Sequence, residues 1–173
     1  MNIRKLLMSA IVTVMMLATA TCFAKISVDD LEINGIYLGQ PISEVVNRFG
    51  QTHAVQCAPK GVSYIYRIGG KNKFTVTSSE NKGGNVVRVG IYENCDFVTK
   101  AGIGVGSSLT DIKASYGDPD KIENLPNFDV INYIGSKGTD EYWLFFTLDK
   151  TSGIVKGFGF FGSGIISGSR SSS

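Results

Sequence analysis

The sequence predicts an α+β protein built from two tandem repeats, each a helix followed by a three-stranded antiparallel meander. The repeats are expected to form one layered domain with both helices on one face of the sheet. Two observations lead to this prediction. A glycine-rich phrase that begins at Gly35 recurs at Gly102, and alternating apolar and polar residues follow each copy. The 67-residue offset exceeds a solenoid unit and suits a duplicated half-domain, so the repeats are placed at residues 25–100 and 101–161.

Residues 1–24 are predicted to be a signal peptide. Arg4 and Lys5 supply the positive start, residues 6–17 form a short apolar stretch, and small residues follow. About a dozen apolar residues are too few to span a bilayer comfortably. The protein is therefore expected to be secreted or periplasmic.

The expected cleavage site follows Ala24. Cleavage after Ala20 is the alternative, but that position lies very close to the apolar stretch. Acylation of Cys22 is not favoured, because Thr21 and Thr19 fit a lipoprotein signal poorly.

Charge argues against a nucleic-acid partner. The whole chain has 17 basic and 15 acidic residues, and two of the basic residues lie in the predicted signal peptide. The remaining chain is formally neutral, so its net charge does not attract phosphate backbones. No stretch after the signal is long and apolar enough for a transmembrane helix.

Each copy of the phrase predicts a short helix. The apolar residues of the first copy have helical spacing: Ile42, Val45, Val46 and Phe49. Ser43 is expected to cap this helix, and Gly50 to end it with a positive φ. Thr110 and Gly117 take the same places in the second copy.

Three strands are expected after each helix. Their predicted ranges are 62–68, 73–78 and 86–92 in the first repeat, and 130–134, 141–148 and 154–161 in the second. Glycine pairs at 69–70 and 83–84 are expected turns. Residues 162–173, mostly Gly and Ser, are expected to be a flexible tail.

The repeated phrase resembles a small exported repeat found in two groups of proteins. Its features are Gly-Ile-x-x-Gly, then a hydroxyl residue and an acid at the helix start, then an aromatic residue and Gly. This pattern is similar to the beta-lactamase inhibitory protein and to outer-membrane assembly lipoproteins of the BamE type. The resemblance covers residues 33–161 and implies an α+β fold and the binding of other proteins. It supplies no catalytic residue.

No catalytic, cofactor or metal site is expected. His53 is the single histidine of the chain, and no nucleophile near it has a suitable context. Asp118-Pro119-Asp120 reads as a turn after a helix. The glycines of residues 102–106 lack the βαβ context and the Lys-Ser/Thr ending of a phosphate loop.

Cys57 and Cys95 are predicted to form a disulfide, since two cysteines remain after cleavage in an oxidising compartment. The expected strand order opposes this pairing, because a simple meander puts the two positions at opposite ends. The alternative is two free thiols.

A binding face is predicted on the side of the sheet away from the helices. Alternation along the strands assigns nine residues to it: Arg67, Lys73, Arg88, Tyr92, Trp143, Phe145, Lys156, Phe158 and Phe160. Exposed aromatic and Arg side chains are typical anchors of protein interfaces. Two alternatives remain: the aromatic residues form a second buried layer, or the register slips by one and inverts the assignment.

The expected function is that of an exported, non-enzymatic protein-binding module, either an envelope accessory factor or an enzyme inhibitor. The partner is expected to be another exported or envelope protein. A binder of small apolar ligands is the alternative, and a hydrolytic enzyme is the least favoured class.

Overall fold

The computed structural model describes residues 26–58, 61–79 and 84–162. The predicted signal peptide, the turn glycine at position 83 and the predicted tail from residue 163 onward lie outside the described residues. The described chain begins with a 3₁₀ turn, η1 (Val28–Asp30), and a small hairpin of β1 (Glu32–Ile33) and β2 (Ile36–Tyr37).

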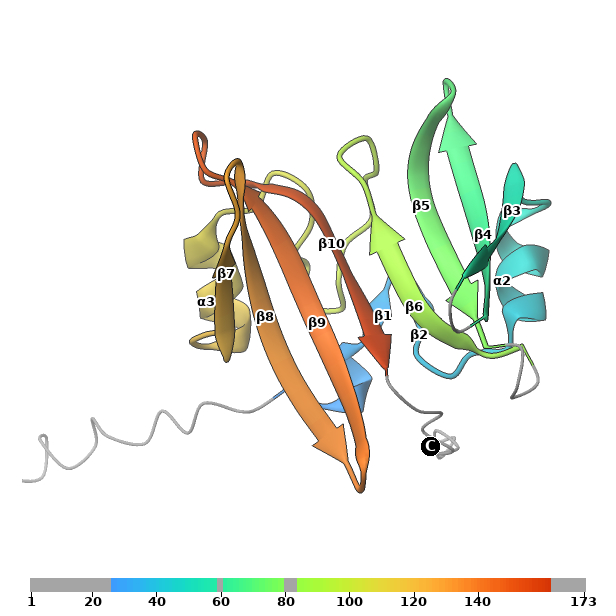
Figure 1. Ribbon diagram of the computed structural model, residues 1–173, viewed down its shortest axis with the longest axis horizontal. Helices are drawn as coiled ribbons and strands as arrows, with labels where there is room; N and C mark the ends of the chain where they lie inside the picture. The colour runs from blue at the N-terminus through green and yellow to red at the C-terminus, as the bar shows by residue number, and fades with distance from the viewer. Residues whose placement is uncertain (1–25, 59–60, 80–83, 163–173) are drawn as a thin grey trace, which may run out of the picture.

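Eight strands form one antiparallel sheet, and two helices lie behind it (Figure 1). From one edge to the other the strands are β3 (Ala54–Ala58), β4 (Gly61–Ile68), β5 (Lys71–Ser78), β6 (Val86–Ile91), β10 (Val155–Gly162), β9 (Asp140–Asp149), β8 (Phe128–Lys137) and β7 (Lys121–Asn124). The helices are α2 (Ile42–Phe49), behind the β3 side, and α3 (Leu109–Tyr116), behind the β7 side.

The predicted fold class is wrong. The described residues are mostly β, with ten strands and two short α-helices, and eight of the strands belong to one continuous sheet rather than to two three-stranded units. The six predicted strands correspond to β4, β5, β6, β8, β9 and β10. Strands β3 and β7 were missed because each is short and gains its order by pairing with one neighbour at an edge of the sheet.

The helix starts also differ from the prediction. Pro41 is the N-cap of α2 and supplies no side-chain bond, whereas Ser108 caps α3 and forms a capping box with Asp111. Ser43 and Thr110, the expected caps, both lie inside the first turn. The expected helix ends are confirmed, since Gly50 and Gly117 follow the helices with φ of 79° and 77°.

The hydrophobic core fills the space between the helices and the sheet. Behind β4 and β5, the Phe49 ring of α2 packs edge-on against Phe74, which stacks on Tyr66 with 4.4 Å between ring centroids. Behind β8 and β9, Tyr116 of α3 lies 5.8 Å from the Phe146 ring. These contacts identify the face of the sheet that the helices cover.

Strands β6 and β10 join the two halves of the sheet. Their register sets Ile91 opposite Phe158 and Gly90 opposite Gly159. A Cβ on Gly159 would collide with the Val89 carbonyl oxygen, so a side chain there would force the two strands apart. The glycine therefore permits the close approach that makes the sheet continuous.

Candidate functional site

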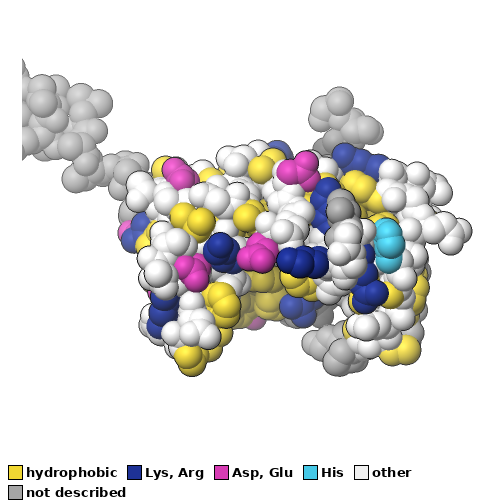
Figure 2. Space-filling model, turned by 90° about the horizontal axis from the view of Figure 1, so that it is seen from above, with side chains coloured by type: hydrophobic (Ala, Val, Ile, Leu, Met, Phe, Trp, Pro, Cys, Tyr) yellow, Lys and Arg dark blue, Asp and Glu magenta, His cyan; other side chains and the backbone are white. Residues whose placement is uncertain are grey.

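The face of the sheet opposite the helices is covered by no described element (Figure 1). We call it the open face and define it by the side chains that alternate with the core residues: Ser63, Ile65, Thr75, Thr77, Arg88, Phe161, Trp143, Phe145, Thr147, Val130 and Ile134. Seen from above in Figure 2, the molecule is hollowed between two lobes on this side, and hydrophobic and basic side chains gather there.

One row of residues crosses the centre of the open face. The sheet register places Arg88 of β6 opposite Phe161 of β10, and Phe161 opposite Trp143 of β9. The Trp143 and Phe161 rings are stacked, with centroids 5.6 Å apart and an angle of 11° between their planes. Both rings are half-buried, and Arg88 is exposed. The row therefore joins an apolar surface to a cationic one.

A third ring extends this apolar surface. Phe145 lies 6.3 Å from Phe161, measured between centroids, and is half-buried. A Cβ built on Gly159 would lie 2.9 Å from Phe145 Cζ. The ring thus occupies the space that a side chain at Gly159 would need. We call Trp143, Phe145 and Phe161 the aromatic cluster.

The Arg88 guanidinium has no ion-pair partner and no ring contact within the part of the chain that the structure describes. On the other side of Phe161 the facing residue is Trp143, which carries no charge. An exposed guanidinium can form two parallel hydrogen bonds to the carboxylate of a partner, and its plane can pack on an aromatic side chain of that partner.

The predicted placement of Phe158 and Phe160 on this face is wrong. Both side chains are buried against the helices, opposite the core residues Ile91 and Val89. The physical reason is a β-bulge in β10 between Val155 and Gly157, which shifts the alternation by one residue. Of the two alternatives, the register slip is the one that the structure shows for β10.

Lys156 lies within that bulge and is half-buried. Asp149 lies near it, and the pKa of this carboxyl is lowered, first by hydrogen bonds from Ser152 and to a smaller extent by the Lys156 charge. The strand register gives Lys156 no partner and sets Phe161, not Lys156, in the row with Arg88 and Trp143.

Three other predicted residues lie toward the edge of the open face or away from it. Arg67 donates from Nε to Asn72 Oδ1 over 3.1 Å. Lys73 pairs with Asp96 at 3.2 Å and lies 5.4 Å from the Phe97 ring centroid, on the side of the α2 core. Tyr92 is 40% exposed and follows the end of β6. The structure brings only Arg88, Trp143 and Phe145 of the predicted set together.

Phe161 was missed by the sequence prediction. The signal for it was present in Gly157 and Gly159, since glycines at alternate positions of a strand indicate one face with no room for side chains. Phe161 continues that face by alternation. The aromatic residues between the glycines then belong to the core.

The titratable residues singled out in the sequence have structural partners. His53 Nδ1 accepts a hydrogen bond from the Arg67 backbone N–H over 3.3 Å. Asp120 accepts one from the Ile134 N–H over 2.7 Å. The described residues contain no group of three His, Cys, Asp or Glu residues that could hold a metal ion.

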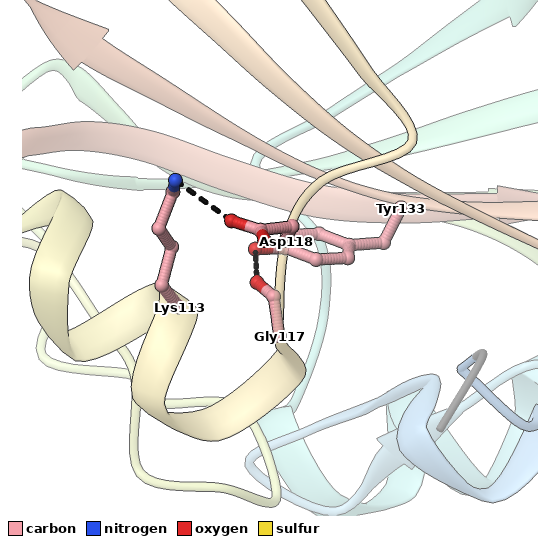
Figure 3. Close-up of polar contacts among 4 residues, drawn as sticks. All are labelled: Lys113, Gly117, Asp118 and Tyr133. Carbon is pink, nitrogen blue, oxygen red and sulfur yellow. Dashed lines mark hydrogen bonds and ion pairs between the residues drawn. The ribbon is translucent and has the colours of Figure 1, made fainter. Parts of the chain in front are cut away.

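Asp118 belongs to a set of contacts at the end of α3 (Figure 3). Lys113 Nζ lies 2.8 Å from Asp118 Oδ1, and the Tyr133 hydroxyl donates to the Gly117 carbonyl over 2.8 Å. Burial raises the pKa of Tyr133 to about 12, and the Asp118 charge adds to the shift. These contacts tie the helix end to β8.

The predicted disulfide is not formed. Cys57 and Cys95 are both free, with Cys57 exposed on edge strand β3 and Cys95 buried after β6. Two strands separate β3 from β6, which corresponds to about 14 Å across the sheet. A disulfide requires Cα atoms within about 7 Å.

Comparison with known proteins places the chain in no family. No protein-family model matches it, and no curated protein matches it. Among solved structures, a DUF4309 family protein (YjgB) from Bacillus subtilis is similar, with 14% sequence identity and a TM-score of 0.46 over 74% of this chain and 82% of that chain. This likeness is too distant to support an inference. The resemblance to the beta-lactamase inhibitory protein and to BamE-type lipoproteins stays an expectation.

None of the helices in the described part of the chain is both long and apolar enough to cross a membrane.

Proposed function

We propose that this protein is an exported, non-catalytic module that binds another exported or envelope protein through its open face. In that role it acts as an envelope accessory factor or as an inhibitor of an extracytoplasmic enzyme. The observation that carries the proposal is the row of Arg88, Phe161 and Trp143 on a sheet face that no described element covers. Tryptophan and arginine are prominent among the residues that dominate binding energy at protein interfaces.

The aromatic cluster supplies the apolar part of the proposed interface. Its three rings are half-buried in the free protein, so a partner would remove their remaining surface from water. The rings already pack on one another and on glycine backbone, and little side-chain freedom is lost when a partner docks. Arg88 supplies the charged part, because a partner carboxylate can pair with its guanidinium.

Export supports the nature of the partner. The proposal of a secreted or periplasmic location depends on the signal-like residues 1–24, which lie outside the described residues. A protein delivered to that compartment meets other exported proteins there.

Affinity capture from an envelope extract tests the proposal. The wild-type protein is expected to retain a specific partner that is lost with the double variant Trp143→Ala/Phe161→Ala and weakened with Arg88→Glu. Val98→Ala is the matched control, since Val98 is also exposed, at 40%, but lies in the loop between β6 and α3. Equal recovery by the wild type and the double variant, with circular dichroism showing both folded, would reject the open face as the binding site.

A small apolar ligand is the second candidate occupant of the same cluster, because Trp143 is stacked on Phe161 beside Phe145. The chain has one tryptophan, so its fluorescence reports on this site alone. A saturable emission shift with an added apolar compound, together with no protein partner, would favour this alternative.

A further inference from the structure

Strand β7 leaves an open edge on the side of the sheet away from β3. No described strand lies beyond it. The Leu125 N–H donates to the Phe128 carbonyl over 2.9 Å. Along an antiparallel ladder the N–H and C=O groups of alternate residues point to the same side. Lys121 and Glu123 therefore direct their N–H and C=O groups toward β8, as Leu125 does. Ile122 and Asn124 then direct their N–H and C=O groups outward.

Exposed apolar side chains gather at this edge. Six large hydrophobic residues are exposed among those the structure describes, and three of them lie on β7 or at the turn into β8. Ile122 and Leu125 are each 45% exposed, and Phe128 is 39% exposed. Single exposed apolar residues are ordinary, but here three lie within seven positions along an unpaired edge, Ile122 on the helix side of the sheet and Phe128 on the open-face side.

The charges of β7 are self-complementary. Lys121 and Glu123 lie on the same side of the strand, and their charged groups are 2.7 Å apart. In an antiparallel pair of two β7 strands centred on Ile122, each Lys121 faces the partner's Glu123. Opposite charges in directly facing cross-strand positions stabilise the pair, whereas like charges destabilise it.

We propose that β7 pairs antiparallel with β7 of a second copy of this chain, with the two Ile122 residues facing each other at the two-fold axis. The outward N–H and C=O of each Ile122 are the groups that such a central pair exchanges. The interface is isologous and closes on itself, so it forms a dimer and not a fibre. The opposite edge, β3, carries no charged residue that would select a register.

The dimer would form one continuous sheet of two copies. A two-fold axis perpendicular to the sheet leaves both open faces on the same side. This inference does not depend on the proposed function, because the edge and the open face involve different residues.

Sedimentation velocity of the purified protein, from micromolar to millimolar concentration, tests the inference by charge exchange. The wild type is expected to dimerise. Lys121→Glu or Glu123→Lys alone is expected to raise the dissociation constant of the dimer about tenfold or more. The double variant Lys121→Glu/Glu123→Lys restores opposite charges across the axis and should recover dimerisation. Lys71→Glu is the control, because it reverses the charge of an exposed residue at the β4–β5 turn, and it should not change the dissociation constant.

A second variant tests the backbone pairing. Ile122→Pro removes the outward N–H and is expected to abolish the dimer while the fold remains, since proline is tolerated at that position of an edge strand. Circular dichroism checks folding. The inference is overturned by a monomeric wild type at millimolar concentration, by a double variant no better than the single ones, or by a dimer that survives Ile122→Pro.

Discussion

The adjacent residues Phe160 and Phe161 offer a direct test of the register of β10. Phe160 is fully buried on the helix side, whereas Phe161 is half-buried on the open face. Replacing a core Phe with Ala costs about 3–5 kcal/mol, because both transfer energy and cavity formation contribute. Phe161→Ala loses a ring stack of about 0.5–1.5 kcal/mol and some buried area, so a total of about 1–2 kcal/mol is expected.

The two variants should therefore differ by about 2–3 kcal/mol in the free energy of unfolding. With a urea dependence of about 2 kcal/mol per molar, the Phe160→Ala midpoint should lie about 1 M or more below that of Phe161→Ala. Far-UV circular dichroism is the suitable probe, because Trp143 fluorescence itself changes when its stacked neighbour is removed. Equal midpoints, or a larger loss for Phe161→Ala, would refute the bulge-shifted register.

Two further predictions concern stability against pH and the thiols. The pKa of Tyr133 is raised to about 12, so between pH 10 and 12 the hydroxyl loses its proton in the unfolded chain and keeps it in the folded chain. The free energy of unfolding should therefore fall as the pH rises, by up to about 1.4 kcal/mol per pH unit from this group. Tyr133→Phe removes the hydrogen bond to the Gly117 carbonyl and should lower the free energy of unfolding by about 1 kcal/mol at neutral pH. Above pH 10 its urea midpoint should approach that of the wild type; a constant difference between the two midpoints across this pH range would contradict the prediction. In native buffer, iodoacetamide should label exposed Cys57 quickly and buried Cys95 only after unfolding, as peptide mapping would show; a peptide pair linked through these residues would contradict the free thiols.

Periodicity was sufficient to predict the long elements of this fold. The apolar spacing from Ile42 to Phe49 predicted α2, and six stretches of alternation predicted the six longest strands. These patterns record which side chains must face a core, and that requirement is local to each element. The Asn34-Gly35 turn of the β1–β2 hairpin also has a sequence signal, since Asn-Gly pairs favour such turns and both residues have a positive φ here.

Edge strands and strand register could not be predicted in the same way. Strand β3 has no strict alternation of apolar and polar residues, and its order depends on pairing with β4. The bulge between Val155 and Gly157 arises from pairing with β9, and alternation of apolar residues alone does not reveal it; only the spacing of Gly157 and Gly159 indicates the shifted face. Because a one-residue slip moves every side chain to the other face, this single feature decided which phenylalanines belonged to the candidate site.

The pairing of β6 with β10 has a consequence for the order of folding. Ile91 meets Phe158 and Arg88 meets Phe161, so the strands that close the centre of the sheet lie 67 to 73 residues apart along the chain. As the chain is synthesised, β6 keeps an unpaired edge until residues 155–162 arrive. Contacts of such sequence separation slow folding, and an exposed strand edge invites wrong partners in the interval. Binding of this nascent edge by a chaperone would protect it until β10 arrives.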